Sequence, residues 1–163
     1  MSDYLNKAAA EIGKSRKEVI DRLVVFSQTD MLLFWGHEKD LIERQEKVWG
    51  PILQWANNEI NVEFVKTQGL DVPENKDSGE KLRDYLNSFS DKELAAFYVA
   101  ALNMKSVLLA IALVKKRLSA EEAFNAAFLD ELWQAESWGV EKEAEKRRSE
   151  LKKELHEVED FLK

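Results

Sequence analysis

The most apolar part of the chain is Leu94-Ala-Ala-Phe-Tyr-Val-Ala-Ala-Leu-Asn-Met-Lys-Ser-Val-Leu-Leu-Ala-Ile-Ala-Leu-Val114. Only Asn103, Lys105 and Ser106 interrupt it. A run of this length could cross a membrane, but an ammonium group at its centre would cost about 3 kcal/mol there. We therefore expect no membrane insertion. The run instead predicts an apolar central helix over 91–117 that is buried on all sides.

Lys105 lies in the middle of this predicted helix. An unpaired ammonium group buried there would cost several kcal/mol, so the amine is expected to meet a carboxylate. The candidates are Asp130 and Glu131, which belong to a predicted helix over 120–137. The alternative is that the long Lys105 side chain extends its amine to solvent along its apolar stem.

The rest of the chain also predicts helices. Its 163 residues are typical of one domain, and 6 Gly and 2 Pro are too few for a β-sandwich or barrel with frequent turns. Capping boxes of the type S-x-x-E predict three helix starts, each before a periodic apolar run. They occur at Ser15/Glu18, Ser90/Glu93 and Ser119/Glu122. We expect a single all-α domain over 1–163, with about seven or eight helices around the helix of 91–117.

Residues 61–79 break the helical periodicity. Val62-Glu63-Phe64 alternates briefly between apolar and polar side chains, and a polar stretch with Pro73 and Gly79 follows. This pattern predicts an extended segment and a long surface loop. Loops of this length in a compact domain are usually functional or mobile.

Charge and composition exclude several classes of function. The formal net charge is −7, the wrong sign for a protein that binds phosphate backbones, so we expect no nucleic acid partner. The chain has no Cys, and neither His37 nor His156 belongs to an E-x-x-H or H-E-x-x-H metal-binding motif. No glycine-rich phosphate-binding motif is present. We therefore expect no catalytic residues, no metal and no cofactor, and a protein that is not an enzyme.

Five tryptophans, at positions 35, 49, 55, 133 and 138, are large enough to dominate a core or an interface. Core packing is the interpretation for Trp49, Trp55 and Trp138. Trp35 lies at a predicted helix end, where core packing and a role in binding stay equally open.

Four segments together resemble one protein family. They are Arg44-Gln-Glu-Lys-Val-Trp-Gly-Pro-Ile-Leu-Gln-Trp55, Lys66-Thr-Gln-Gly-Leu70, Met104-Lys-Ser-Val-Leu-Leu109 and Leu129-Asp-Glu-Leu-Trp-Gln-Ala-Glu-Ser-Trp-Gly139. In order and spacing they are similar to the signature stretches of the assembly chaperone for the alpha subunit of the F1 sector of ATP synthase, found in mitochondria and alpha-proteobacteria. The resemblance is strongest over 16–140. It corresponds to the helical C-terminal part of the family, and nothing here corresponds to the family's β-rich N-terminal domain.

The resemblance implies a chaperone that binds the free alpha subunit and prevents its aggregation until the beta subunit replaces it. An acidic position in the last segment is regarded as important in the family, and here it aligns with Asp130. Asp is one methylene shorter than Glu, so the role could have moved to Glu131. The candidate client-binding residues are Asp130, Glu131, Trp133 and Trp35.

The expected partner is the alpha subunit, and the expected oligomeric state is a monomer. The first residues contain neither an apolar signal sequence nor a transit peptide, so we expect a bacterial cytoplasm, or the mitochondrial matrix in a eukaryote. Two other functions stay open at this point. One is a small helical enzyme that uses Lys105 and Asp130, and the other is an oligomerisation domain that uses the last helix as a coiled-coil seam.

Overall fold

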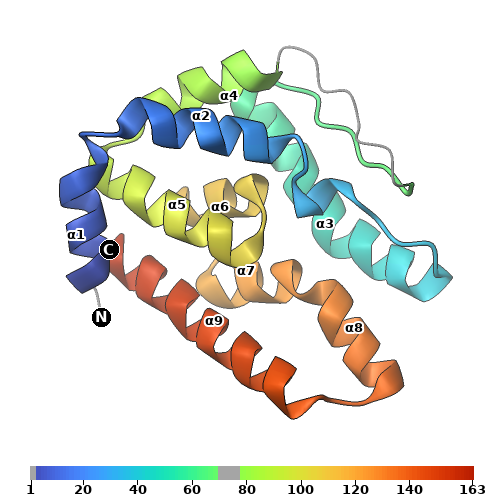
Figure 1. Ribbon diagram of the computed structural model, residues 1–163. Coiled ribbons are helices and arrows are strands. Elements are labelled where there is room, and N and C mark those ends of the chain that lie inside the picture. Colours follow the sequence, from blue (N-terminus) through green and yellow to red (C-terminus); the bar gives the residue numbers. More distant parts are fainter. Residues whose placement is uncertain (1–2, 70–77) are drawn as a thin grey trace.

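The computed structural model describes residues 3–69 and 78–163. These residues form nine α-helices and one short 3-10 helix, without a β-strand, which confirms the all-α prediction. Along the chain the elements are α1 (Asp3–Ile12), α2 (Arg16–Ser27), η1 (Met31–Leu33), α3 (Lys39–Ile60), α4 (Ser78–Asn87), α5 (Asp91–Met104), α6 (Val107–Val114), α7 (Ala120–Ala127), α8 (Leu129–Trp138) and α9 (Lys142–Phe161) (Figure 1).

Helices α5 and α6 form the middle of the fold. They lie between α2 and α4 on one side and α7 and α9 on the other, with α1 packed along α5 and α3 packed on α6 (Figure 1). All eight residues of α6 are buried. Helix α5 contributes four fully buried alanines at positions 95, 96, 100 and 101, and such small side chains allow α1 and α6 to approach closely. The core is therefore centred on the apolar stretch that the sequence singles out.

The central helix predicted over 91–117 is in fact two helices. Lys105 adopts a left-handed conformation with φ 56° and ends α5, where its N–H donates to the carbonyl of Ala101. Ser106 then caps α6, because its hydroxyl accepts a hydrogen bond from the N–H of Leu109 at 3.1 Å. A serine is a favoured helix N-cap, and here it starts a new helix inside an apolar run.

This break corrects the prediction of a buried, paired Lys105. Its side chain is exposed, and within the described residues it forms no ion pair with Asp130, Glu131 or any other acid. The alternative, a side chain that reaches solvent, is what the structure shows. The physical reason is that a residue at a helix C-terminus in the left-handed conformation projects away from the packed helix faces.

A buried carboxylate, Asp30, fixes this break in place. One oxygen accepts hydrogen bonds from the Ser106 hydroxyl at 2.6 Å and from the N–H of Leu32 at 2.9 Å, and the other accepts from the N–H of Leu108 at 2.9 Å. Burial raises the pKa of Asp30, while these hydrogen bonds lower it. We call this arrangement the Asp30 junction. It joins the beginnings of η1 and α6, whose free N–H groups favour a negative charge.

Two of the three predicted capping boxes are present. Ser90 and Glu93 bond reciprocally at the start of α5, and Ser119 and Glu122 do the same at the start of α7. Ser15 precedes α2 but its side chain makes no capping hydrogen bond. Its backbone, at φ −126° and ψ 24°, lies outside the extended region in which a capping hydroxyl reaches the helix N–H groups.

An extended segment follows α3, as the sequence predicts. The Asn57 side-chain amide forms two hydrogen bonds of 2.9 and 3.1 Å with the backbone of Phe64. It thus bonds to the N–H and the carbonyl of Phe64 as the backbone of a neighbouring strand would. Thr67 then forms a parallel bridge with Phe34. The part of the predicted loop over 70–77 lies outside the described residues, and α4 begins directly after it.

Candidate functional site

Helix α8 presents one face to solvent next to the beginning of α3. Leu129 and Leu132 pack on the hydrophobic core, which orients the helix. With 3.6 residues per turn, Asp130, Gln134 and Trp138 follow one another along the broad outer face of α8, each rotated by about 40° from the one before. We call these three residues the α8 stripe. Among the predicted site residues, Asp130 is the one that belongs to it.

Asp130 is half-buried at one end of the α8 stripe. Its Oδ1 accepts a hydrogen bond from Nε2 of the buried Gln45 at 3.0 Å, and Gln45 Oε1 accepts from the N–H of Gly36 at 3.0 Å. Burial raises the pKa of the Asp130 carboxyl, the Gln45 hydrogen bond lowers it, and the negative charge of Glu38 raises it further. The carboxylate is thus partly desolvated without a cation beside it, so a cation brought by a partner would be attracted to it.

Glu131 points to the other side of α8 and pairs with α9. Its Oε1 lies 2.6 Å from Arg147 Nη2 and 3.5 Å from Arg148 Nη1, and Arg148 is buried. These ion pairs fasten α8 to α9. The structure therefore separates the two adjacent acids, because Glu131 pairs with cations of α9 whereas Asp130 accepts a hydrogen bond from Gln45 of α3.

Besides the hydrogen bond from Gln45 to Asp130, two further contacts connect α8 to α3. The Trp133 indole N–H donates to Asp40 Oδ2 at 2.8 Å, and Arg44 lies 2.7 Å from Glu136. The Trp133 ring is partly buried and packs against the core. Trp133 therefore supports the position of α8, and only part of its surface is available to a partner.

Trp35 belongs to the core. Its side chain is 6% exposed, and its indole N–H donates to the carbonyl of Leu32 at 3.0 Å. The ring meets Trp49 edge-on, with 6.1 Å between centroids, and the Lys66 amine lies 3.8 Å from the ring centroid on its other side. The structure does not bring Trp35 together with Asp130 on one exposed surface.

Trp49 and Trp55 lie in or against the core, as predicted, but the prediction for Trp138 is wrong. Trp49 is fully buried and Trp55 packs against the core. Trp138 is 87% exposed because it is the last residue of α8, and Gly139, at φ 89°, turns the chain away immediately after it. Sequence reasoning missed Trp138 as a surface residue, although its spacing of eight from Asp130 was a usable signal. Gln45, the donor to Asp130, had no such signal.

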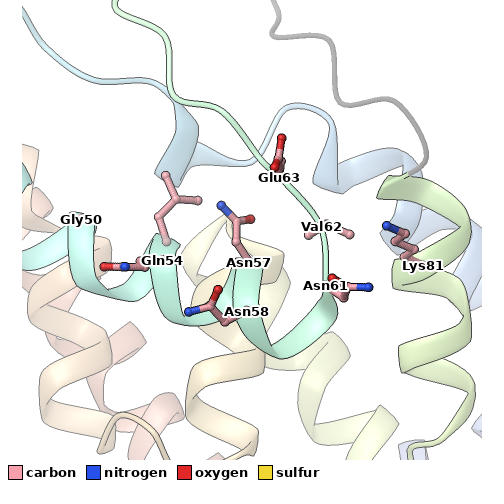
Figure 2. Close-up of a pocket in the computed structure, with 9 residues that line it drawn as sticks. Gly50, Gln54, Asn57, Asn58, Asn61, Val62, Glu63 and Lys81 are labelled. Carbon is pink, nitrogen blue, oxygen red and sulfur yellow. The ribbon is translucent and has the colours of Figure 1, made fainter.

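A separate groove of about 710 Å³ runs along the C-terminal half of α3 (Figure 2). Side-chain amides of Gln54, Asn57 and Asn58 line it, with Glu63 and Lys81 as its charged residues. A groove lined mainly by amides offers hydrogen bonds but no nucleophile or pair of carboxylates for acid and base catalysis. The sequence analysis did not single out this groove.

The described residues contain no group of three or more His, Cys, Asp or Glu side chains arranged to hold a metal ion. His37 is exposed, and His156 lies 3.4 Å from Glu121 at the surface. In the part of the chain that the structure covers, none of the helices combines the length and the apolar character needed to cross a membrane.

Comparison with known proteins gives consistent results. A family model described as ATP12 chaperone protein matches residues 1–57. The mitochondrial protein atp12 of Schizosaccharomyces pombe is 26% identical over 139 residues, which cover 80% of this chain and 48% of that protein. The crystal structure of Atp12 from Paracoccus denitrificans has a TM-score of 0.90 at 25% identity, over 96% of this chain and 68% of that one. A candidate chaperone from Agrobacterium tumefaciens has a TM-score of 0.85 at 28% identity, over 96% and 59%.

The described residues form a small all-α domain, and among them no cluster of His, Cys, Asp or Glu is arranged to hold a metal ion. The similarities in sequence and structure are more specific: the chain resembles the ATP12 chaperone family, by a family model over residues 1–57 and by an overall fold shared with Atp12. It spans about half the length of the curated relative it matches. The family model and the Agrobacterium tumefaciens protein are described as chaperones and not as enzymes.

Proposed function

We propose that this chain is a chaperone that binds the free alpha subunit of the F1 sector and prevents its aggregation during ATP synthase assembly. The observation that supports this most is the agreement with the Atp12 structure, at a TM-score of 0.90 over 96% of the chain. The four sequence segments quoted above resemble the same family, and one of them forms α8.

Asp130 is the acidic residue that we expect to contact the client. Its side chain is half-buried, and the remainder faces solvent. Among the described residues, the Gln45 amide donates a hydrogen bond to its carboxylate. Glu131 is paired with Arg147 and Arg148, which favours Asp130 over Glu131 as the proposed client contact. A Lys or Arg of the client beside Asp130 would gain a charge-assisted hydrogen bond with an anion that is already partly desolvated.

Release of the client would follow from competition. The chain contains no phosphate-binding loop that could couple nucleotide hydrolysis to release. A beta subunit that buries the same client surface more extensively would displace the chaperone by mass action. Binding is therefore expected to be stoichiometric and independent of ATP.

The two other functions considered from the sequence have no support in the geometry. Lys105 is exposed at the break between α5 and α6 and forms no ion pair with Asp130, so the two do not make a catalytic pair. The apolar side of α9, with Leu155 and Val158, is buried against α5 and α7 and is not free to form a coiled-coil seam.

The test is light scattering of dilute, free alpha subunit, with this chain titrated in and ATP omitted. We expect aggregation to stop near equimolar chaperone. Asp130→Lys should weaken binding at least tenfold while the melting temperature stays close to that of the wild type. Asp84→Lys, a charge reversal at an exposed position of α4, is the matched control and should bind like the wild type.

Aggregation that continues at a several-fold molar excess of the wild type would overturn the proposal. Equal loss of binding in Asp130→Lys and Asp84→Lys would show that overall charge, and not the α8 surface, governs the interaction.

A further inference from the structure

The end of α8 carries an exposed aromatic side chain that the fold does not use. Trp138 is 87% exposed, and Val140, two residues further, is 58% exposed. Gly139 lies between them at φ 89°, in the connection from α8 to α9 (Figure 1). Exposed single aliphatic residues are common, but a tryptophan is among the side chains that contribute most to protein interfaces.

Helix α8, which carries Trp138, forms ion pairs with both neighbouring helices, α3 and α9. In the last part of α8, Glu136 pairs with Arg44 of α3 at 2.7 Å. On the other side of the helix, Glu131 pairs with Arg147 and Arg148 of α9. Because α8 is tied to a helix on each side, little backbone ordering is needed when a partner contacts Trp138, and this lowers the entropic cost of binding.

Trp138 lies on the same broad outer face of α8 as Asp130, rotated from it by about 80° around the helix axis. The two residues are eight apart in one helix, which places their Cα atoms about 12 Å apart along its axis. Gln134 lies between them on the same face, completing the α8 stripe. The stripe therefore has a half-buried carboxylate at one end and a large apolar side chain at the other.

The charges around the α8 stripe favour a basic partner. Glu38 is exposed, and its negative charge raises the pKa of Asp130. Glu141, just beyond the turn, is also exposed, and the whole chain has a formal net charge of −7. Complementary charge attracts and orients a partner, while an apolar anchor supplies most of the affinity.

We propose that Trp138, together with Val140, is the apolar anchor of the client-binding surface. Its occupant is a client surface on which an apolar pocket lies about 12 Å from the Lys or Arg that pairs with Asp130. This inference rests on the proposed function and adds to it the anchoring residue and the chemical pattern of the client site.

The first test measures the affinity of free alpha subunit for purified variants of the full chain. Trp138→Ala is expected to weaken binding at least tenfold, and Trp138→Phe is expected to weaken it less. Leu102→Ala is the matched control, because Leu102 is an exposed apolar residue of α5, 49% exposed and outside α8. This control should change the affinity less than twofold, and all three variants should melt close to the wild type.

The second test uses tryptophan fluorescence with acrylamide as a neutral quencher. Four of the five tryptophans are buried or partly buried, so Trp138 supplies most of the quenchable signal. Trp138→Ala should lose most of the quenching, and a saturating concentration of alpha subunit should protect the wild type to a similar extent.

The outcomes separate the two proposals. If the wild type binds and Trp138→Ala binds equally well, the anchor is wrong and the proposed function stands. If the wild type does not bind the alpha subunit at all, both are wrong. If the wild type forms concentration-dependent dimers that Trp138→Ala abolishes, the α8 stripe binds a second copy of this chain and the proposal is overturned. If the wild type binds phosphatidylglycerol vesicles and this binding requires Trp138, the α8 stripe binds a lipid surface and the proposal is likewise overturned.

Discussion

Two aspartates with raised pKa values serve the molecule in different ways. Asp30 is fully buried, and its two oxygens accept hydrogen bonds from the hydroxyl of Ser106 and from the N–H groups of Leu32 and Leu108. Asp130 is half-buried and receives a hydrogen bond from Gln45. Burial is the largest cause of the raised pKa in both.

The difference lies in how fully the fold satisfies each carboxylate. Donors from η1 and from the start of α6 surround Asp30, so its charge is used to hold helices together. Around Asp130 the nearest charged group that affects its pKa is Glu38, which is also negative. A buried acid with a full set of donors is typical of structure, whereas a partly buried acid with a like charge nearby is a candidate for binding. Mutations can test this distinction.

The largest effect is expected from Asp30→Ala. It removes a buried acceptor from three donors, and each unsatisfied buried donor costs about 1–3 kcal/mol. We expect the free energy of unfolding to fall by about 3–5 kcal/mol, measured by urea denaturation at pH 7. Asp130→Ala is the matched variant and should lower it by less than about 1 kcal/mol. Similar losses in the two variants would contradict the distinction.

An intermediate effect is expected from Glu131→Lys. The substitution removes two ion pairs and places a third positive charge beside Arg147 and the buried Arg148. We expect the free energy of unfolding to fall by about 1–3 kcal/mol, visible as a lower melting temperature. Asp130→Lys, at the adjacent position, should lose client binding with little change in melting temperature. If Glu131→Lys melts like the wild type but does not bind, Glu131 is a client contact.

The smallest effect concerns pH. The pKa of Asp130 is higher in the folded chain than in the unfolded chain, so protonation of this group favours folding. Its favourable contribution is complete below the unfolded pKa and is lost as pH rises through the folded pKa. Asp130→Asn cannot titrate, so its free energy of unfolding relative to the wild type should be higher at pH 7 than at pH 4. We expect a difference of no more than about 1 kcal/mol, because solvent screens a half-exposed carboxylate.

This difference can be measured by urea denaturation at the two pH values. Client binding by the wild type should change with pH in the opposite direction, since a neutral Asp130 no longer attracts a cation. A binding affinity that is constant from pH 4 to pH 7 would mean that the charge of Asp130 is not used.

The sequence was sufficient for the fold class and for several helix starts. Apolar periodicity and local capping chemistry act within a few residues, so Ser90 and Ser119 could be recognised directly. The central apolar stretch was correctly placed in the core. Its break at Ser106 was harder to predict, because it depends on Asp30, far away in the sequence, which supplies the acceptor that the start of α6 needs.

The site was predicted less completely for the same reason. Asp130 could be named from the resemblance, but its partner Gln45 comes from α3 and is brought to it only by packing. Trp138 was assigned to the core because tryptophans are usually buried there. Whether a residue at the end of a helix is covered depends on where the next helix goes, and Gly139 sends the chain away from it.

The complete burial of α6 has a consequence for synthesis on the ribosome. This helix and α5 are the packing partners of α1, α2 and α3, yet they are translated after them. At roughly 5–20 residues per second, α1 is complete about 5–20 seconds before α6, which ends 102 residues later (114 − 12). During that time α1 lacks α5, its main packing partner, whereas α2 can already pack on α4. A protein proposed to shield another chain from aggregation thus passes through the same vulnerable stage during its own translation.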